Sequence, residues 1–213
     1  MKLAIISDVH GNLPALNRVI DANKDVDGYI CLGDVVNYGP WSNECVDIIT
    51  ALPNSIYIKG NHEEYFLKGE YKGDNEVVKA FFDFCYPKFT KIDKIKNLPD
   101  TYELNGFTFS HTIEDRYIYP DSEVKLDSNH VVGHSHHQFR IEDNGYKLYN
   151  PGSVGQNRGF INVINYMVLD TDTMDFVEKS ITYDADLVID EMRRSGYPEI
   201  CIDYYNNKSR AKT

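Results

Sequence analysis

The stretch KLAIISDVHGNLPALNRVIDAN, residues 2–23, decides the fold and is the starting point for the rest of the chain. Its opening KLAII is mostly apolar and predicts a buried strand, and SDVHGN follows as a polar loop. The spacing of one helix face then runs through Leu13, Leu16, Val19 and Ile20. Asn12 can cap this helix, and Pro14 falls in its first turn, where proline is tolerated. Strand, loop and helix in this order predict the first unit of an α/β fold.

The residues that follow repeat this unit. GYICL at 28–32 predicts a second strand, residues 42–51 a second helix that Ser42 can cap, and SIYIK at 55–59 a third strand. Alternating strands and helices are typical of parallel strands joined by crossover helices. Residues 62–97 are expected to be mainly helical, with Tyr65 and Phe66 packing inside the first helix of that region.

From about residue 101 the pattern changes to short runs rich in β-branched and aromatic residues. These runs are TYELN, FTFSH, HVVGH, QFRIE, YKLYN, INYMVLD and MDFVEKSI. Asp-Asn-Gly at 143–145 predicts a hairpin, and a last helix fits residues 184–195. We therefore predict an α/β fold of two packed, mostly mixed β-sheets flanked by helices. Residues 1–213 are expected to form a single domain, with a flexible tail from about 204 to 213.

Composition limits the classes of partner. The net charge of −11 disfavours a duplex nucleic-acid surface, which needs clustered Lys and Arg, but a small metal site can still bind phosphate. The four cysteines form no CxxC pair, which favours a reducing compartment. The N-terminus is polar by its seventh residue and no stretch has the apolar length of a membrane span, so we expect a cytoplasmic protein without a membrane partner. A homo-oligomer remains open.

Ionisable and amide side chains gather just after the predicted strands. They are Asp8, His10, Asp34, Asn61, His62, His111, His134 and His136. Each one alone is more often a cap or turn residue than a ligand. Together they use five of the seven histidines, and each lies where a strand ends. In open α/β sheets the crevice beyond the carboxyl ends of the strands is where ligands bind, so the set predicts one binding site.

The chemistry that fits this set is a pair of divalent metal ions. Mixed nitrogen and oxygen donors suit Zn, Mn, Fe, Co or Ni and do not suit a calcium cage. A carboxylate shared by both ions would hold them about 3.5–4 Å apart, the spacing used for in-line displacement at phosphorus. Glycines precede Asp34, Asn61 and His134, where the backbone must turn tightly.

The ordered series Asp8-x-His10, Gly33-Asp34, Gly60-Asn61-His62-Glu63, His111 and Gly133-His134-x-His136 resembles the calcineurin-like metallophosphoesterase superfamily. SDVHGNLPAL, LGDVVNYGPWSNEC and NPGSVGQNR are similar to the small prokaryotic phosphoesterases of the YfcE-like group. That group includes diesterases and diadenosine tetraphosphatase-type members. The resemblance implies a four-layer β-sandwich.

The resemblance also implies a role for each motif residue. The implied metal ligands are Asp8, His10 and His136 at one ion, Asn61, His111 and His134 at the other, and Asp34 as the bridge between them. A hydroxide bridging the ions would be the nucleophile, because metals lower the pKa of bound water to about 7. His62 would act as general acid or phosphate clamp, and Glu63 would orient the loop or cap the helix. Two divalent ions are expected, with Mn or Fe favoured.

Further residues are candidates for substrate binding. Arg158 can clamp a phosphate or be a solvated surface residue, Tyr38 can stack on a base or pack, and Asn12 can contact substrate or only cap its helix. Asn37 stands where the group more often has glycine, and we expect it to shape the substrate rim.

The predicted function is two-metal hydrolysis of a phosphoester, with a phosphodiester or a small nucleotide such as a dinucleoside polyphosphate as substrate. A phosphomonoesterase or a protein phosphatase is the alternative. A lower-ranked alternative is a non-catalytic metal-binding scaffold for protein interaction, which loss of a ligand or of the acid histidine would favour; none is missing here.

Overall fold

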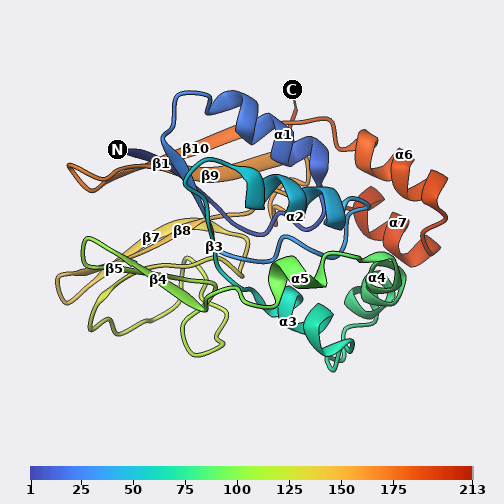
Figure 1. Ribbon diagram of the computed structural model, residues 1–213, viewed down its shortest axis with the longest axis horizontal. Helices are drawn as coiled ribbons and strands as arrows, with labels where there is room; N and C mark the ends of the chain where they lie inside the picture. The colour runs from blue at the N-terminus through green and yellow to red at the C-terminus, as the bar shows by residue number, and fades with distance from the viewer. Residues whose placement is uncertain (213) are drawn as a thin grey trace.

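Two five-stranded sheets stack face to face in the computed structural model, which describes residues 1–212 (Figure 1). Sheet A has the order β10 (Asp175–Thr182), β9 (Val163–Asp170), β1 (Lys2–Ile6), β2 (Gly28–Cys31) and β3 (Ile56–Tyr57). Sheet B has the order β4 (Thr101–Leu104), β5 (Phe107–Ser110), β6 (Asn129–Val131), β8 (Tyr146–Pro151) and β7 (Gln138–Asp143). The predicted fold class of two mixed sheets is confirmed.

The parallel strands of both sheets end on the same side of the molecule. In sheet A, β1 pairs in parallel with β2 and β2 with β3, as the strand–helix alternation predicts. In sheet B, β5, β6 and β8 are parallel neighbours. The ends of β2 and β5 meet across the two sheets, because the His111 ring nitrogen Nδ1 lies 2.8 Å from the carbonyl oxygen of Leu32. The loops after these strands therefore form one crevice.

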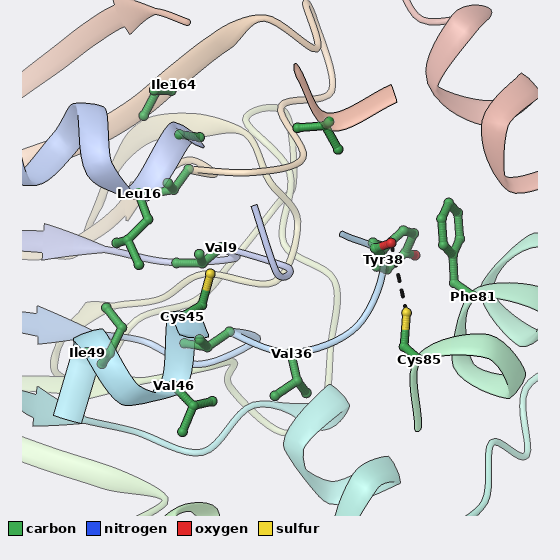
Figure 2. Packing of buried hydrophobic residues seen from close by; sticks show 14 of the residues in the cluster. Val9, Leu16, Val36, Tyr38, Cys45, Val46, Ile49, Phe81, Cys85 and Ile164 are labelled. Carbon is green, nitrogen blue, oxygen red and sulfur yellow. Dashed lines mark hydrogen bonds between the residues drawn. The ribbon is translucent and has the colours of Figure 1, made fainter. Parts of the chain in front are cut away.

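Helices cover the outer face of sheet A and the end of the sandwich. Their bounds are α1 (Leu13–Ala22), α2 (Ser42–Ala51), α3 (Asn61–Lys68), α4 (Glu76–Cys85), the short 3₁₀ helix at Tyr86–Lys88, α5 (Ile92–Ile95), α6 (Asp186–Ser195) and α7 (Glu199–Asn206). Leu16 of α1 gathers with Cys45 and Ile49 of α2 around Val9, just beyond β1 (Figure 2). Burying each large aliphatic side chain stabilises the fold by about 1.5–3 kcal/mol.

A second core fills the space between the sheets. Its buried members include Ile5, Ile30, Leu32, Ile58, Phe107, Phe109, Val131, Tyr149 and Met167. Most of these side chains come from the strands that carry the site loops or from the residues just after those strands, so the packing between the sheets fixes the positions of the loops relative to one another.

A four-layer sandwich implies helices on the outer face of sheet B, but a loop covers this face instead. Ile118 and Leu126 pack there against Phe139 and Leu148. Both come from the connection between β5 and β6, and the described residues of that connection form no helix. The fourth layer on this face is a loop.

Two local predictions need correction. Ser42 does not cap α2: Trp41 is the N-cap, and the Ser42 hydroxyl instead accepts a hydrogen bond from the Asn37 N–H at 3.0 Å. The predicted tail from about 204 begins inside α7, which the sequence analysis missed. Tyr205 of that helix is fully buried, because α7 packs beside α4 and α6. Thr213, the last residue of the predicted tail, lies outside the described residues.

Candidate metal centre

Backbone strain is concentrated in the loops of the crevice. Asp8, His10, Asp34, His134 and His136 all have φ between 49° and 67°, in the left-handed region that few residues other than glycine adopt. Such residues cost free energy and persist where the surrounding structure holds them, commonly at functional sites. Five of the seven predicted metal ligands are held in this way.

Two glycines let the loops approach one another. Gly33 has φ +100°, and a Cβ there would lie 2.6 Å from the Gly60 nitrogen. A Cβ on Gly60 would in turn lie 2.5 Å from the Asp34 nitrogen. The absence of both side chains allows the Asp34 loop to lie directly against the start of α3.

Asp8, His10 and His136 form one buried cluster. His136 Nε2 lies 3.3 Å from Asp8 Oδ1, and His10 Nε2 lies 3.2 Å from His136 Nε2. The ligand atoms of all three residues lie within 4.8 Å of one another. One ion could be held by this cluster.

Asp34, His111 and His134 form a second cluster with the same property. His111 Nε2 lies 3.2 Å from Asp34 Oδ2, 3.1 Å from His134 Nδ1 and 3.0 Å from Asn61 Oδ1. Asp34 Oδ2 also lies 3.9 Å from His10 Nε2 of the first cluster. The Asp34 carboxylate therefore stands between the two clusters, where a shared ligand must stand.

The hydrogen bonds on the far side of the rings show that these clusters fit cations. Nδ1 of His10, His111 and His136 faces the carbonyl oxygens of Val36, Leu32 and Gln156, at 3.2, 2.8 and 2.8 Å. A carbonyl only accepts, so Nδ1 carries the proton and Nε2 of a neutral ring presents a lone pair. The two lone pairs of His10 and His136 would then face one another. Asp8 Oδ1, which is buried, has no hydrogen-bond partner. A metal ion satisfies all of these groups.

The protonation states of the clusters also favour cation binding. Burial opposes ionisation of Asp8 and Asp34, but the neighbouring His136 and His111 hold the pKa of both carboxyls below its ordinary value. Burial also opposes the charged form of His111, yet Asp34 outweighs it and raises the pKa of His111 to about 10. Burial lowers the pKa of His134 to about 4. Without metal, the second cluster thus holds a proton where an ion would bind.

His62 lies beside the clusters and differs from their histidines in its partner. Its Nδ1 is 3.0 Å from the Asn37 side-chain nitrogen, and its Nε2 is 4.0 Å from Asp34 Oδ2. Burial lowers the pKa of His62, which the Asp34 charge partly opposes. His62 also falls within ligand distance of His10 and Asp34, so geometry alone permits a ligand role as well.

Asn37 is not a rim residue, contrary to expectation. It is fully buried with φ 73°, and its amide packs against the His62 ring rather than facing substrate. Sequence reasoning missed this contact because the two residues are far apart in the chain and meet only when the second and third site loops pack together.

Glu63 organises the crevice to a degree that the sequence did not reveal. Its buried carboxylate accepts hydrogen bonds from the backbone N–H groups of Asp34, Val35, Val36 and Gly60 and from the Tyr57 hydroxyl, at 2.7 to 3.2 Å. It thereby fixes the Asp34 loop to the start of α3. A glutamate three residues after a helix cap is the signal that could have indicated such a role.

The three candidates for substrate binding have different positions. Tyr38 and Arg158 line a cavity of about 210 Å³ in front of the clusters. Asn12 instead caps α1 by accepting from the Ala15 N–H at 3.1 Å, and its amide nitrogen donates to the Tyr183 hydroxyl at 2.8 Å. The structure therefore supports the capping alternative for Asn12 and not a substrate contact.

Comparison with known proteins gives the family. The model of the calcineurin-like phosphoesterase family matches residues 1–179. The chain belongs to this family. It is a metal-dependent phosphoesterase of the YfcE-like group. No helix among the described residues combines the length and apolar character that crossing a membrane requires.

Three relatives show how far the similarity extends. The uncharacterised protein MJ0912 of Methanocaldococcus jannaschii is 31% identical over 92% of this chain and 94% of its own length. The phosphodiesterase YfcE of Escherichia coli is 24% identical over 83% of this chain and 91% of its own. A metallophosphoesterase of Sphaerobacter thermophilus has a similar structure, with a TM-score of 0.82, 25% identity, and coverage of 97% of this chain and 98% of that one.

Proposed function

We propose that this phosphoesterase is a two-metal phosphodiesterase. The observation that carries the proposal is that two cavities, of about 210 and 470 Å³, meet at the metal centre. Both are lined by Asn61, Tyr65, Tyr117 and His134. A diester has two substituents on its phosphorus, and two cavities that meet at the centre provide room for both. The name of the relative YfcE, a phosphodiesterase, supports the same class.

The proposed ligands are Asp8, His10 and His136 for one ion, Asn61, His111 and His134 for the other, and Asp34 for both. Two divalent ions supply hydroxide at neutral pH and neutralise the charge of the phosphoryl group. The donor set suits Mn, Fe, Zn, Co or Ni, and we propose Mn or Fe as the native metal. The protein contributes fixed ligand positions, which the carbonyl partners of the histidine rings and the Glu63 hydrogen bonds maintain.

His62 is the proposed proton donor to the leaving oxygen. It lines the smaller cavity and is not among the described residues that line the larger one. The leaving group therefore departs on the side of the smaller cavity. Arg158 lines the same cavity and is the proposed clamp for substrate phosphate.

Besides diesters, the proposed substrates include small nucleotides such as dinucleoside polyphosphates, which are cleaved at a phosphoanhydride bond. The decisive experiment compares bis-p-nitrophenyl phosphate with p-nitrophenyl phosphate as substrates in the presence of Mn²⁺. We expect turnover of both, with a clear preference for the diester in kcat/KM. Preference for the monoester would support the phosphomonoesterase alternative, and absence of turnover with both ions bound would support a scaffold.

A further inference from the structure

The smaller cavity has an unusual lining of tyrosines. Tyr38, Tyr65, Tyr71, Tyr117 and Tyr204 all border it, and we call this part of the site the tyrosine compartment. They come from separate parts of the chain: the second site loop, α3, the connection from α3 to α4, the connection from β5 to β6, and α7. Tyr204 lies beyond the residues that match the family model. Tyr65, which we expect to have a packing role, packs against the core and also borders this cavity.

The tyrosine rings are anchored on the catalytic centre itself. Tyr65 meets the His62 ring edge to face with ring centres 5.4 Å apart, and Tyr71 meets Tyr65 in the same manner at 5.1 Å. Tyr117 lies against the ring of His134, with ring centres 3.8 Å apart. Contacts of this kind hold aromatic rings in defined orientations. A group bound at the metals would therefore meet tyrosine rings beside His62 and beside His134.

The size and polarity of the compartment limit its ligand. Its volume of about 210 Å³ lies below the range of about 300–1,000 Å³ that holds drug-sized ligands. That volume admits one planar ring system rather than a whole dinucleotide. Val77 and Val78 add apolar surface. The Arg158 guanidinium, which donates to the Tyr204 hydroxyl at 3.0 Å, adds a cationic group at the border. Aromatic rings and a guanidinium plane are the surfaces on which bases stack.

The larger cavity provides the contrast. Apart from the two tyrosines shared with the smaller cavity, its lining includes Glu64, Asp100, Asp115 and Lys59. Lys59 is already paired with Asp100 at 2.7 Å. Among the described residues, this lining is richer in carboxylates than that of the tyrosine compartment, and it has no tyrosine beyond the two shared ones. The two substituents of a substrate therefore meet different chemistry, and an aromatic ring fits the side of His62.

We propose that the tyrosine compartment binds an aromatic ring of the substrate, a nucleobase or an aryl group, on the His62 side of the scissile phosphate. The inference rests on the proposed phosphodiesterase function and deepens it by assigning Tyr65, Tyr71, Tyr117 and Tyr204 as specificity residues. In the reaction, water adds to phosphorus, the bond from phosphorus to the leaving oxygen breaks, and that oxygen takes a proton. The ring remains in the compartment until the product dissociates.

Binding of monoesters in which the phosphate carries the leaving group tests the proposal without requiring turnover of a diester. Calorimetry on the Mn²⁺-loaded protein would compare AMP with ribose 5-phosphate, which has the same phosphate and sugar but no base. We expect AMP to bind at least about tenfold more tightly, since stacking of one base on aromatic side chains has an effect of that size or more. Phenyl phosphate forms a third arm. The affinity that phenyl phosphate loses when a tyrosine of the compartment is replaced can be compared with the affinity that AMP loses. The larger loss shows whether the compartment prefers a ring directly on the phosphate or one carried by a sugar.

Variants locate the effect in the compartment. Tyr71→Ala should bring the ratio of the AMP and ribose 5-phosphate affinities close to one, whereas Tyr71→Phe should keep it. Tyr117→Ala is a second test, because Tyr117 is 56% exposed and its removal does not threaten the fold. Tyr146→Ala is the matched control, since Tyr146 is an exposed tyrosine at the start of β8, at the end of the strand away from the site. A ratio near one in the unmodified protein, or an unchanged ratio in both alanine variants, would overturn the proposal.

The same samples separate this inference from the proposed function. Turnover of bis-p-nitrophenyl phosphate without any preference for AMP would refute the compartment and leave the phosphodiesterase intact. A preference for AMP that the variants remove, without turnover of any diester, would refute the phosphodiesterase and leave an aromatic phosphate site.

Discussion

His62 differs from the ligand histidines in what holds its ring. Nδ1 of His10, His111 and His136 faces a backbone carbonyl, whereas Nδ1 of His62 faces the Asn37 amide nitrogen at 3.0 Å. When this amide donates, His62 Nδ1 accepts and Nε2 carries the proton. That proton points toward the metal side of the crevice, where a leaving oxygen can use it. The rings of His10, His111 and His136 are therefore set to bind metal, and the ring of His62 is set to donate a proton.

His62→Gln tests this difference. We expect Mn²⁺ content close to normal and a loss of about 10²–10⁴-fold in kcat/KM for a diester with an alkyl leaving group, since that group needs a proton. The loss should be smaller for bis-p-nitrophenyl phosphate, whose leaving group is stable as an anion. His130→Gln is the control, because His130 lies at β6 outside both clusters. Metal loss in His62→Gln that parallels the loss of activity would instead make His62 a ligand.

Asp34 is the residue whose loss should affect both ions. Its Oδ2 lies 3.2 Å from His111 Nε2 and 3.9 Å from His10 Nε2, one from each cluster. We expect Asp34→Asn to lower the occupancy of both ions, measured by elemental analysis after dialysis, and to reduce turnover at least about 10²-fold. Asp47→Asn removes a carboxylate outside the clusters and should change neither. Full occupancy of both sites in Asp34→Asn would exclude a bridging role.

At the scale of elements, the site depends on how the Asp34 loop is attached to α3. Glu63 makes this attachment, because its single carboxylate satisfies four backbone N–H groups and one hydroxyl. In Glu63→Gln an amide nitrogen would face at least one of these donors. We expect the free energy of unfolding to fall by about 1–3 kcal/mol, measured in urea, because a buried donor is left unsatisfied.

The control for Glu63 is its neighbour in sequence. Glu64→Gln removes an exposed carboxylate whose ion pair with Lys68 is on the helix surface, and such pairs contribute little. It should change stability by less than about 0.5 kcal/mol. If Glu63→Gln behaved like Glu64→Gln, the carboxylate would not be what attaches the loop to the helix.

The elements that the sequence predicted best are those whose pattern is local. β1, α1, β2 and α2 follow from apolar periodicity within a few residues of the predicted bounds. α7 was missed although Pro198 precedes it and Glu199 lies in its first turn, because its apolar residues contact α4 and α6 and form no long periodic run. The structure brings the motif residues that follow the strands together at the crevice. The tyrosine compartment was not, since its members come together only through tertiary packing.

At the scale of the whole molecule, the two sheets bring opposite charges together at one edge. Asp8 and Asp34 come from sheet A, and His111 and His134 come from sheet B. In the metal-free protein this edge keeps a proton on His111, whose pKa is raised to about 10 although burial opposes the charge. An ion that binds there must displace this proton, because only the neutral ring has a lone pair to donate.

Metal binding near neutral pH should therefore release one proton from His111, in addition to the proton that water loses when it becomes hydroxide on the ions. His134, with its pKa lowered to about 4, is already neutral, and the carboxyls of Asp8 and Asp34 have lost their protons. Below the pKa of His111, each unit by which the pH falls should weaken the apparent affinity for Mn²⁺ about tenfold. Calorimetry in buffers that differ in ionisation enthalpy measures the released proton. If the enthalpy of metal binding did not depend on the buffer, and the affinity for Mn²⁺ did not change between pH 6 and 8, His111 would be neutral before metal binds.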